Sequence, residues 1–269
     1  MSTRGGKVAL LGVVVAGFAF LYLPLVVLVV FSFNASKLVS VWGGWSAKWY
    51  LELFRNEQIL DAAWLSLKIA MINATGATLL GTMAGLALAR FGRFGGRTLF
   101  TGLIAAPLVM PDVIIGISLL LTFVSMEQFI GWPHGRGIDT ILIAHITFST
   151  AYVAIVVQSR ASGLDRSIEE AALDLGARPM TAFLLVTLPM LAPALASGWL
   201  LAFTLSLDDL VIASFVSGPG SSTLPMVIFS KVRLGVTPEI NALATLLIGA
   251  VALAAGAATW IQIRRSNRA

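Results

Sequence analysis

Apolar residues gather in six long stretches of this chain, and most polar and charged residues lie between them. The stretches are Val8 to Phe31, Ala62 to Ala89, Leu99 to Val124, Ile138 to Val157, Met190 to Val216 and Asn241 to Ile263. Each holds about 20 residues or more, the length that a helix needs to cross a hydrocarbon core about 30 Å thick. None alternates with the period of two that a transmembrane barrel strand requires. The pattern predicts about six transmembrane helices.

The composition agrees with a place in a lipid bilayer. Of the 269 residues, 58% are hydrophobic and 12% are charged, with a mean hydropathy of +0.91, whereas an ordinary soluble domain is about 25% charged. The chain has no cysteine, which excludes disulfides, cysteine-ligated zinc and a cysteine nucleophile. We therefore expect an all-α integral membrane protein whose residues 1–269 form a single transmembrane domain.

The distribution of basic residues predicts the orientation. With the N-terminus inside, 11 of the 18 Lys and Arg residues fall at inner ends of the stretches and the other 7 at outer ends. Positive charge is enriched on the cytoplasmic side of membrane proteins, so both termini are expected in the cytoplasm. The net charge of +5 is spread over the span ends rather than gathered in one patch, and this argues against nucleic acid as a partner.

A polar segment between the fourth and fifth stretches has the pattern of a short amphipathic helix. Asp165 or Ser167 is suited to cap its first turn, and Ser167 with Glu170 has the spacing of a capping box. Positions i, i+3, i+4 and i+7 form one apolar stripe of Ile168, Ala171, Ala172 and Leu175. Such a helix either lies on the inner leaflet or docks on a protein. Its polar face carries more acid than base, and it lacks Trp and Phe, which favours docking.

The same segment resembles a family motif. Three residues separate Glu170-Ala171-Ala172 from Gly176, and nine more separate it from Val186-Thr187-Leu188-Pro189. This spacing resembles the EAA loop of binding-protein-dependent ABC importer permeases, although isoleucine is usual where Val186 stands. The resemblance implies a type I ABC importer permease, with a coupling helix between the fourth and fifth spans in a loop of about residues 160–189. In that family the helix docks on an ATPase subunit. The implied coupling residues are Glu169, Glu170, Ala171, Ala172 and Gly176.

Three further segments resemble the polyamine branch of that family, so that the resemblance covers nearly the whole chain. They are Met110 to Ser118, Leu205 to Pro219 and Pro238 to Thr245. The resemblance implies a permease subunit of a bacterial inner membrane that carries putrescine, spermidine or both from periplasm to cytoplasm. Its implied partners are a second homologous permease, two copies of an ABC ATPase and a periplasmic polyamine-binding protein. ATP and magnesium would bind the ATPase, and no cofactor is expected in this chain.

The sequence offers little catalytic chemistry. Gly5-Gly6-Lys7 is followed by valine rather than serine or threonine and lacks the upstream glycine of a phosphate loop, so ATP hydrolysis must come from a partner. His145 has no second histidine or cysteine at ligand spacing, and a hydrogen bond between helices is expected rather than a metal site. Ser206 has no histidine nearby in sequence, so a nucleophilic triad is poorly supported.

Acidic residues within the apolar stretches are candidates for a path that ammonium groups follow. An Asp at the centre of a membrane helix costs about 2.5 to 3.5 kcal/mol, and such residues usually face a cavity or a partner. Asp112 would lie about 20 Å along the third stretch at helical pitch. Pro107 and Pro111 are expected to bend this helix or to break it so that it lines a cavity. Asp208 and Asp209 lie near the outer end of the fifth stretch.

Each candidate also has a structural interpretation. Asp112 would serve equally as an interhelical hydrogen-bond partner or a gate, while Asp208 and Asp209 would cap a helix end or pair with a basic residue of the following loop. Glu239 is a candidate guard of the outer end. Three aromatic residues would wall the path or simply pack between helices: Tyr152, Trp199 and Phe203.

Other functions stay open at this point. The same kind of permease would serve ferric ion or sulfate, although an anion path should place Arg, Lys or helix N-termini at membrane depth, and the deep charges here are Asp. A secondary transporter driven by an ion gradient would be favoured by an inverted repeat, which the sequence does not show. It would also leave Glu170-Ala171-Ala172 unexplained. The preferred polyamine depends in part on the second permease and the binding protein.

Overall fold

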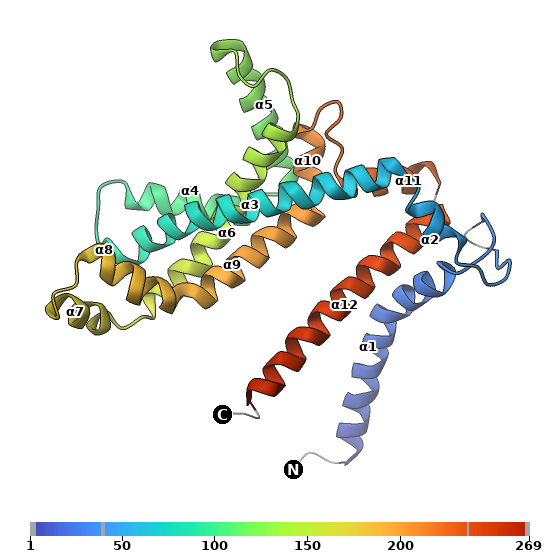
Figure 1. Cartoon of the computed structure of the whole chain (residues 1–269), viewed down its shortest axis with the longest axis horizontal. Helices are drawn as coiled ribbons and strands as arrows, with labels where there is room; N and C mark the ends of the chain where they lie inside the picture. Colours follow the sequence, from blue (N-terminus) through green and yellow to red (C-terminus); the bar gives the residue numbers. More distant parts are fainter. Residues whose placement is uncertain (1–3, 39–40, 236, 267–269) are drawn as a thin grey trace. The chain divides into compact units, whose positions relative to one another are not determined.

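The computed structural model describes residues 4–38, 41–235 and 237–266 (Figure 1). Within these residues the chain is helical, and the single strand-type pairing is an isolated bridge between Asn34 and Trp45. The helices are α1 (Arg4–Phe31), α2 (Lys48–Leu53), α3 (Glu57–Arg90), α4 (Arg97–Val109), α5 (Asp112–Ile130), α6 (Ile138–Ser162), α7 (Arg166–Asp174), α8 (Pro179–Ala182), the π-helical turn η1 (Phe183–Thr187), α9 (Leu188–Asp208), α10 (Val211–Val216), α11 (Leu224–Leu234) and α12 (Pro238–Ser266).

The chain forms two compact units. The first comprises residues 1–60 and 228–269, and the second comprises residues 61–227. The first unit contains α1, α2 and α12, while the second contains α4 to α10 and most of α3. That the two units act as a single transmembrane domain stays a prediction.

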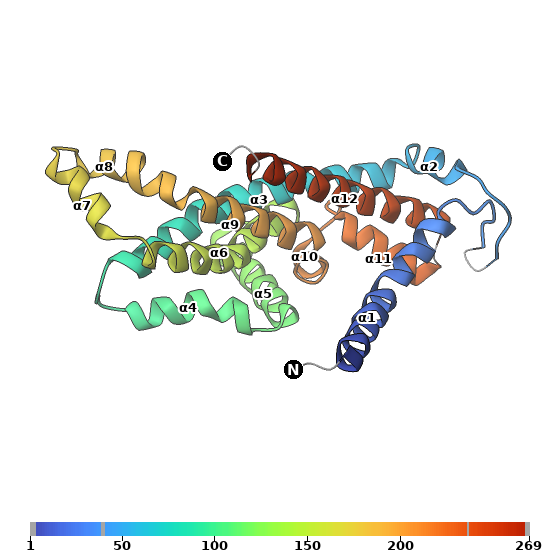
Figure 2. The ribbon, with the colours of Figure 1, turned by 90° about the horizontal axis from the view of Figure 1, so that it is seen from below.

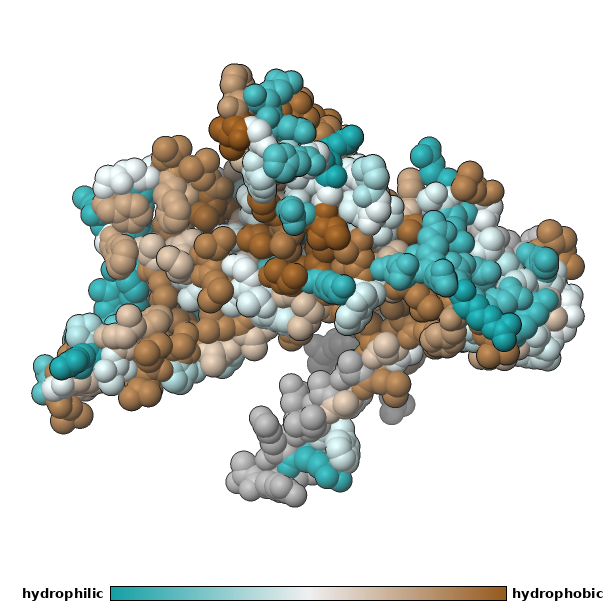
Figure 3. Space-filling model, turned by 45° about the horizontal axis from the view of Figure 1, so that its top comes forward, coloured by the Kyte–Doolittle hydropathy of each residue, from teal (hydrophilic) through white to brown (hydrophobic). Residues whose placement is uncertain are grey.

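Long apolar helices confirm the predicted all-α membrane architecture. Five segments of the described residues are long and apolar enough to cross a membrane: Leu10–Phe31, Glu57–Arg90, Asp112–Ile130, Ile138–Ser162 and Pro179–Asp208. Two shorter apolar segments are Arg97–Val109, which is α4, and Pro238–Leu253, which is the first part of α12. Apolar side chains cover much of the surface seen in Figure 3, as expected of helices solvated by lipid. A count of about six spans stays a prediction.

The third and fifth predicted stretches are each broken. The backbone of Met110 and Pro111 is extended, with ψ of 138° at both residues, between the end of α4 and the start of α5. Proline offers no N–H to a helical ladder and disfavours helix in the residue before it. The continuous helix assumed in placing Asp112 is therefore wrong, and Asp112 is the first residue of α5. The fifth stretch likewise ends as α9 at Asp208, and α10 is separate.

Glycines allow α3 to pack closely on α6 in the second unit. A Cβ at Gly81 would lie 2.6 Å from the Cβ of Val153, and one at Gly85 would lie 2.6 Å from the carbonyl oxygen of Ala154. Residues four apart share a helix face, so both contacts belong to one seam. Small residues with this spacing let helix backbones approach closely in membrane proteins.

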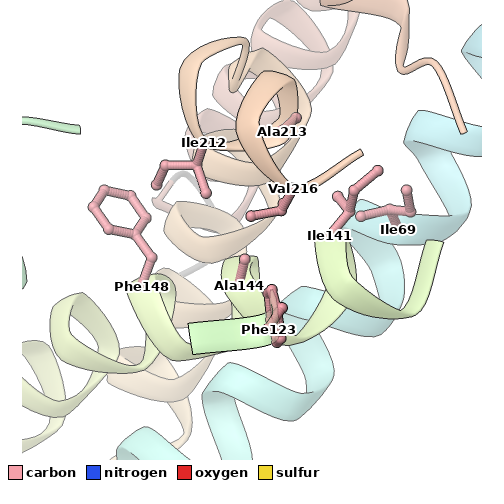
Figure 4. Close-up of a cluster of buried hydrophobic side chains, with 8 residues drawn as sticks. All are labelled: Ile69, Phe123, Ile141, Ala144, Phe148, Ile212, Ala213 and Val216. Carbon is pink, nitrogen blue, oxygen red and sulfur yellow. The ribbon is translucent and has the colours of Figure 1, made fainter. Parts of the chain in front are cut away.

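An apolar cluster holds four helices of the second unit together (Figure 4). Its buried members come from α3, α5, α6 and α10 and are Ile69, Phe123, Ile141, Ala144, Phe148, Ile212, Ala213 and Val216. The short helix α10 supplies three of these eight side chains. The cluster therefore fixes α10 against α5 and α6, beside the break that follows α9.

The first unit is organised where α1 ends. The hydroxyl groups of Ser32 and Tyr50 lie 2.7 Å apart, and the Trp49 indole N–H donates to the Asn34 carbonyl at 2.6 Å. The buried Asn34 side chain accepts from the Gly43 N–H at 2.7 Å and so closes the loop before α2. Figures 1 and 2 show the end of α1 near the start of α12, so that α1 runs toward this shared end and α12 runs away from it.

Candidate functional site

The predicted short amphipathic helix is present as α7, and its N-terminal cap is Asp165. The Asp165 Oδ1 accepts a hydrogen bond from the Ser167 backbone N–H at 2.9 Å, which satisfies one of the free donors of the first turn. The bond from that backbone N–H, with a second from the Ser167 side chain, holds the pKa of the Asp165 carboxyl below its ordinary value. Of the two caps that the sequence allowed, the structure uses the aspartate.

Gly176 ends α7 in a Schellman motif. The Gly176 N–H donates to the Leu173 carbonyl at 2.9 Å, and the Ala177 N–H donates to the Ala172 carbonyl at 3.1 Å. Gly176 has φ of +87°, a left-handed conformation that strains residues with a Cβ. The glycine of the family motif is therefore needed by the backbone. It ends the helix after two and a half turns and turns the chain toward α8.

The motif residues of α7 are exposed rather than packed into the second unit. Glu170 and Ala171 are exposed, Ala172 is half-buried, and the stripe residues Ile168 and Leu175 are 45% and 90% exposed. A groove of about 280 Å³ lies between α7 and the end of α3 and is lined by Arg90, Phe91, Arg166, Glu169, Glu170 and Leu173. A short helix that exposes its apolar stripe has not satisfied that stripe within its own unit.

An ion pair connects α7 to α3. Arg90 Nη2, on the last residue of α3, lies 3.3 Å from Glu169 Oε2. The Arg90 side chain is 17% exposed and that of Glu169 is 36% exposed. In the sequence, Arg90 counts only among the basic residues at the inner ends of the apolar stretches, because nothing local links it to a glutamate far along the chain. The one signal in the sequence was its positive charge at the end of the second stretch.

The loop returns to the membrane helices through a π-helical turn. η1 covers Phe183–Thr187 and runs directly into α9. Pro189, in the first turn of α9, lacks the N–H that would bond to the carbonyl four residues earlier. The wider π turn accommodates this missing bond. The Val186 to Pro189 part of the motif thus joins the α7 loop to α9 in one helical rod.

A second polar group lies where α9 gives way to α10. His145 Nδ1 is 2.8 Å from Ser206 Oγ, and His145 Nε2 is 3.1 Å from Asp209 Oδ2. Asp209 also accepts from the backbone N–H groups of Ile212 at 3.2 Å and Ala213 at 2.7 Å. We call His145, Ser206 and Asp209 the polar node. The predicted interhelical hydrogen bond of His145 is confirmed, and Asp209 caps α10.

Ser206 has no histidine nearby in sequence, but in space it lies beside His145 of α6. Ser206 is 5% exposed and His145 is 2% exposed. A nucleophile needs access to a substrate carbonyl, which this burial denies. The node is therefore a bridge between α6, α9 and the start of α10, not a catalytic triad. No cluster of three potential metal-ligating His, Cys, Asp or Glu residues occurs in the described part of the chain.

Three of the predicted pathway residues share one electrostatic neighbourhood. Asp112, at the start of α5, interacts through its charge with Asp208, the last residue of α9, and with Tyr152 of α6. Asp112 and Asp208 are exposed in the second unit, and Tyr152 is half-buried beside Phe148, with ring centroids 5.1 Å apart. Each of these two carboxylates lies at a helix end that a break in a predicted stretch creates: Asp112 begins α5, and Asp208 ends α9.

Other predicted pathway residues have identified packing partners. The rings of Trp199 and Phe203 stack with centroids 5.4 Å apart at an interplanar angle of 9°, and both are half-buried. The Trp199 indole N–H donates to Thr75 Oγ1 at 3.3 Å. Glu239 belongs to the first unit, where its carboxylate accepts from Asn56 Nδ2 at 3.1 Å. Their part in a solute path stays a prediction.

Comparison with known proteins supplies a family. Residues 77–264 match the family described as binding-protein-dependent transport system inner membrane component. The chain is 60% identical over 256 residues to the putrescine transport system permease protein PotI of Escherichia coli (strain K12), covering 95% of this chain and 91% of that protein. It is 42% identical over 237 residues to the spermidine/putrescine transport system permease protein PotC of the same strain, covering 88% and 87%.

A solved structure has the same fold. A bacterial ABC transporter involved in the import of the acidic polysaccharide alginate contains a chain that matches with a TM-score of 0.75. The match covers 96% of this chain and 98% of that chain at 16% identity. At that identity the likeness concerns the fold alone.

Proposed function

Because the chain belongs to the family of binding-protein-dependent transport system inner membrane components, we propose that it is the membrane-spanning permease subunit of an ATP-driven importer of polyamines. Its substrates are putrescine, spermidine or both, carried from periplasm to cytoplasm. The observation that carries this proposal is the 60% identity with a putrescine permease over 95% of the chain. The matched region includes both α7 and the acidic residues.

The chemistry of a polyamine fits the acidic neighbourhood. A polyamine is a flexible methylene chain that carries two or more ammonium groups, so its path needs separated carboxylates and apolar or aromatic walls. Asp112 and Asp208 are exposed carboxylates on different helices. Asp208 also lies at the C-terminal end of α9, where the helix dipole favours a cation. Tyr152, Trp199 and Phe203 supply the aromatic walls, and Glu239 acts at the outer end.

Energy enters through α7 in this proposal. Glu170, Ala171 and Ala172 meet a cleft on the ATPase partner, and nucleotide-driven closure of the ATPase pair moves α7. The rod of η1 and α9 carries that motion directly to Asp208, because α9 ends at this residue. The ion pair between Arg90 and Glu169 carries it to α3. Both routes are continuous structures within the second unit.

The proposed assembly contains this chain, a second homologous permease, two ATPase copies that bind ATP and magnesium, and a periplasmic polyamine-binding protein. Both termini of this chain lie in the cytoplasm, which agrees with the opposite directions of α1 and α12. The two units act together as one permease domain. The chain hydrolyses nothing itself, and the bilayer solvates its apolar helices.

Transport by the reconstituted complex tests this function. Vesicles with ATP enclosed and the loaded binding protein outside should take up labelled putrescine or spermidine, and vesicles enclosing a non-hydrolysable ATP analogue should not. Uptake that ignores ATP would favour a secondary transporter. ATP-driven uptake of ferric ion or sulfate, with neither polyamine carried, would replace the proposed substrate class and keep the ABC mechanism.

A further inference from the structure

His145 occupies an unusual position for an ionisable residue in an apolar helix. It is 2% exposed and follows Ala144, a member of the apolar cluster. Both ring nitrogens have partners, Ser206 on α9 at 2.8 Å and Asp209 at 3.1 Å. A group buried in low dielectric with both polar atoms engaged holds its partners strongly, since losing either bond leaves an unsatisfied buried group.

The bonds of Asp209 determine which way the imidazole is arranged. Asp209 Oδ1 accepts from the Ile212 N–H, and Oδ2 accepts from the Ala213 N–H. An ionised carboxylate only accepts hydrogen bonds, so His145 Nε2 carries the proton in its contact with Asp209 Oδ2. In the neutral ring Nδ1 is then the acceptor for the Ser206 hydroxyl. One imidazole thereby fixes both the last turn of α9 and the cap of α10.

This arrangement separates the roles of two adjacent aspartates. Asp209 is half-buried and directed to α10 and His145, whereas Asp208 is exposed at the end of α9. Asp208 lies between two anchors, because Ser206 and Asp209 on either side of it are both held by His145. The polar node therefore holds the backbone on both sides of Asp208.

We propose that His145 is a positioning residue for cation recognition, and this proposal rests on the proposed function. His145 holds Asp209 as the cap of α10, so that Asp208 faces the solute. The charged groups around this site come from every element at the junction: Asp112 from α5, His145 from α6, and Asp208 and Asp209 from the end of α9. His145 touches the carboxylate that does not bind the solute, and it acts on recognition through the backbone between residues 206 and 209.

Uptake kinetics of three variants test the positioning role in the reconstituted complex. His145→Leu removes both bonds and should raise the KM for putrescine about tenfold or more, with the ATPase subunits still co-purifying. His145→Gln keeps a donor in place of Nε2 and should recover most of the wild-type KM. His134→Gln, at the only other histidine of the chain and an exposed one, should leave KM unchanged. Equal losses in the Leu and Gln variants, or an unchanged KM in the Leu variant, would overturn the proposal.

Imidazole signals test the polar node independently of the solute. With His134→Gln as background, ¹⁵N-labelled histidine reports His145 alone in the same vesicles. We expect a fixed tautomer with the proton on Nε2; Asp209→Asn should shift the Nε2 signal and Ser206→Ala the Nδ1 signal. Exchange between tautomers, or signals indifferent to both changes, would contradict the node even if His145→Leu fails to assemble. Wild-type vesicles that carry neither polyamine would defeat the proposed function, while the imidazole signals still decide the node.

Discussion

The α7 loop and the polar node are both built from helix caps, yet they differ in where their partners come from. α7 is capped by Asp165 through a residue two positions away, and it ends at Gly176 through bonds within five residues. The node joins His145 to residues 61 and 64 positions further along the chain. α7 is exposed, whereas His145 and Ser206 are buried. A short exposed helix can be encoded by residues within a few positions of one another, but a buried polar group needs residues from several helices.

The largest difference between the two regions should come from reversing a charge on the exposed face of α7. Glu170→Lys should reduce ATP-driven uptake on the order of a hundredfold, at the upper range of coupling between sites, because a like charge would meet the surface that the acid contacts. Insertion into the membrane should be unaffected, since Glu170 is exposed in its own unit. Uptake and co-purification of the ATPase measure this together. Wild-type values for both would remove α7 from the coupling path.

A change at Asp208 tests the second region, where α9 ends beside the polar node. Asp208→Asn should raise the KM for putrescine about tenfold, because a charge-assisted hydrogen bond to ammonium becomes a neutral one. The ATPase activity should persist, since the residue lies at the opposite end of α9 from the α7 loop. The matched control is Glu239→Gln, a carboxylate of the first unit bonded to Asn56, for which we expect a smaller rise in KM. An Asp208→Asn variant with wild-type KM would argue against this carboxylate as a cation ligand.

The ion pair between α3 and α7 should give a smaller effect. Arg90→Glu or Glu169→Arg alone should lower uptake about two- to fivefold, the range expected of a partly exposed pair. Combining both substitutions restores opposite charges, so the double variant should recover much of the lost uptake. Initial uptake rates at saturating putrescine are compared for wild type, the two single variants and the double variant. Additive losses in the double variant would show that the pair transmits nothing.

The smallest effect concerns the cap of α7. Because the pKa of Asp165 is lower in the capped helix than in the open one, its stabilisation is present above the ordinary pKa of the carboxyl. It is lost as the pH falls through the folded value. The protection factors of α7 amides, which are corrected for the intrinsic pH dependence of exchange, should fall several-fold in Asp165→Ala, and in wild type at acid pH. Asp165→Asn, which keeps an acceptor, should exchange like wild type at neutral pH and lose the acid dependence.

The sequence predicted those features whose physical cause is local. Helical periodicity located α7, its small residues and its glycine, because caps and stripes depend on neighbours within a turn or two. Hydrophobic length located the membrane helices for the same reason. The break at Met110 and Pro111 was expected as a bend or a broken helix. A missing proline N–H removes a helical bond but does not determine how far the chain departs from the helix.

The features that escaped prediction depend on contacts across the chain. A hydrogen bond between helices was expected for His145, but its partners could not be named because they lie on α9 and at the start of α10. Capping was one of two alternatives for Asp209, and the choice depends on where α9 ends. Arg90 showed no partner for the same reason. Trp199 and Phe203 were plausible wall residues from type and spacing alone, while their stacking and half-burial depend on the packing of α9 with α3 and α6.

The central claim, that energy enters at α7 and the cation is recognised at the end of α9, is tested most directly by uptake kinetics in one set of vesicles. Labelled putrescine uptake is measured with enclosed ATP for wild type, Glu170→Lys and Asp208→Asn. We predict ATP-dependent uptake by wild type, a lowered maximal rate with unchanged KM for Glu170→Lys, and a raised KM with retained ATP hydrolysis for Asp208→Asn. Wild-type uptake that proceeds equally without ATP would contradict the claim.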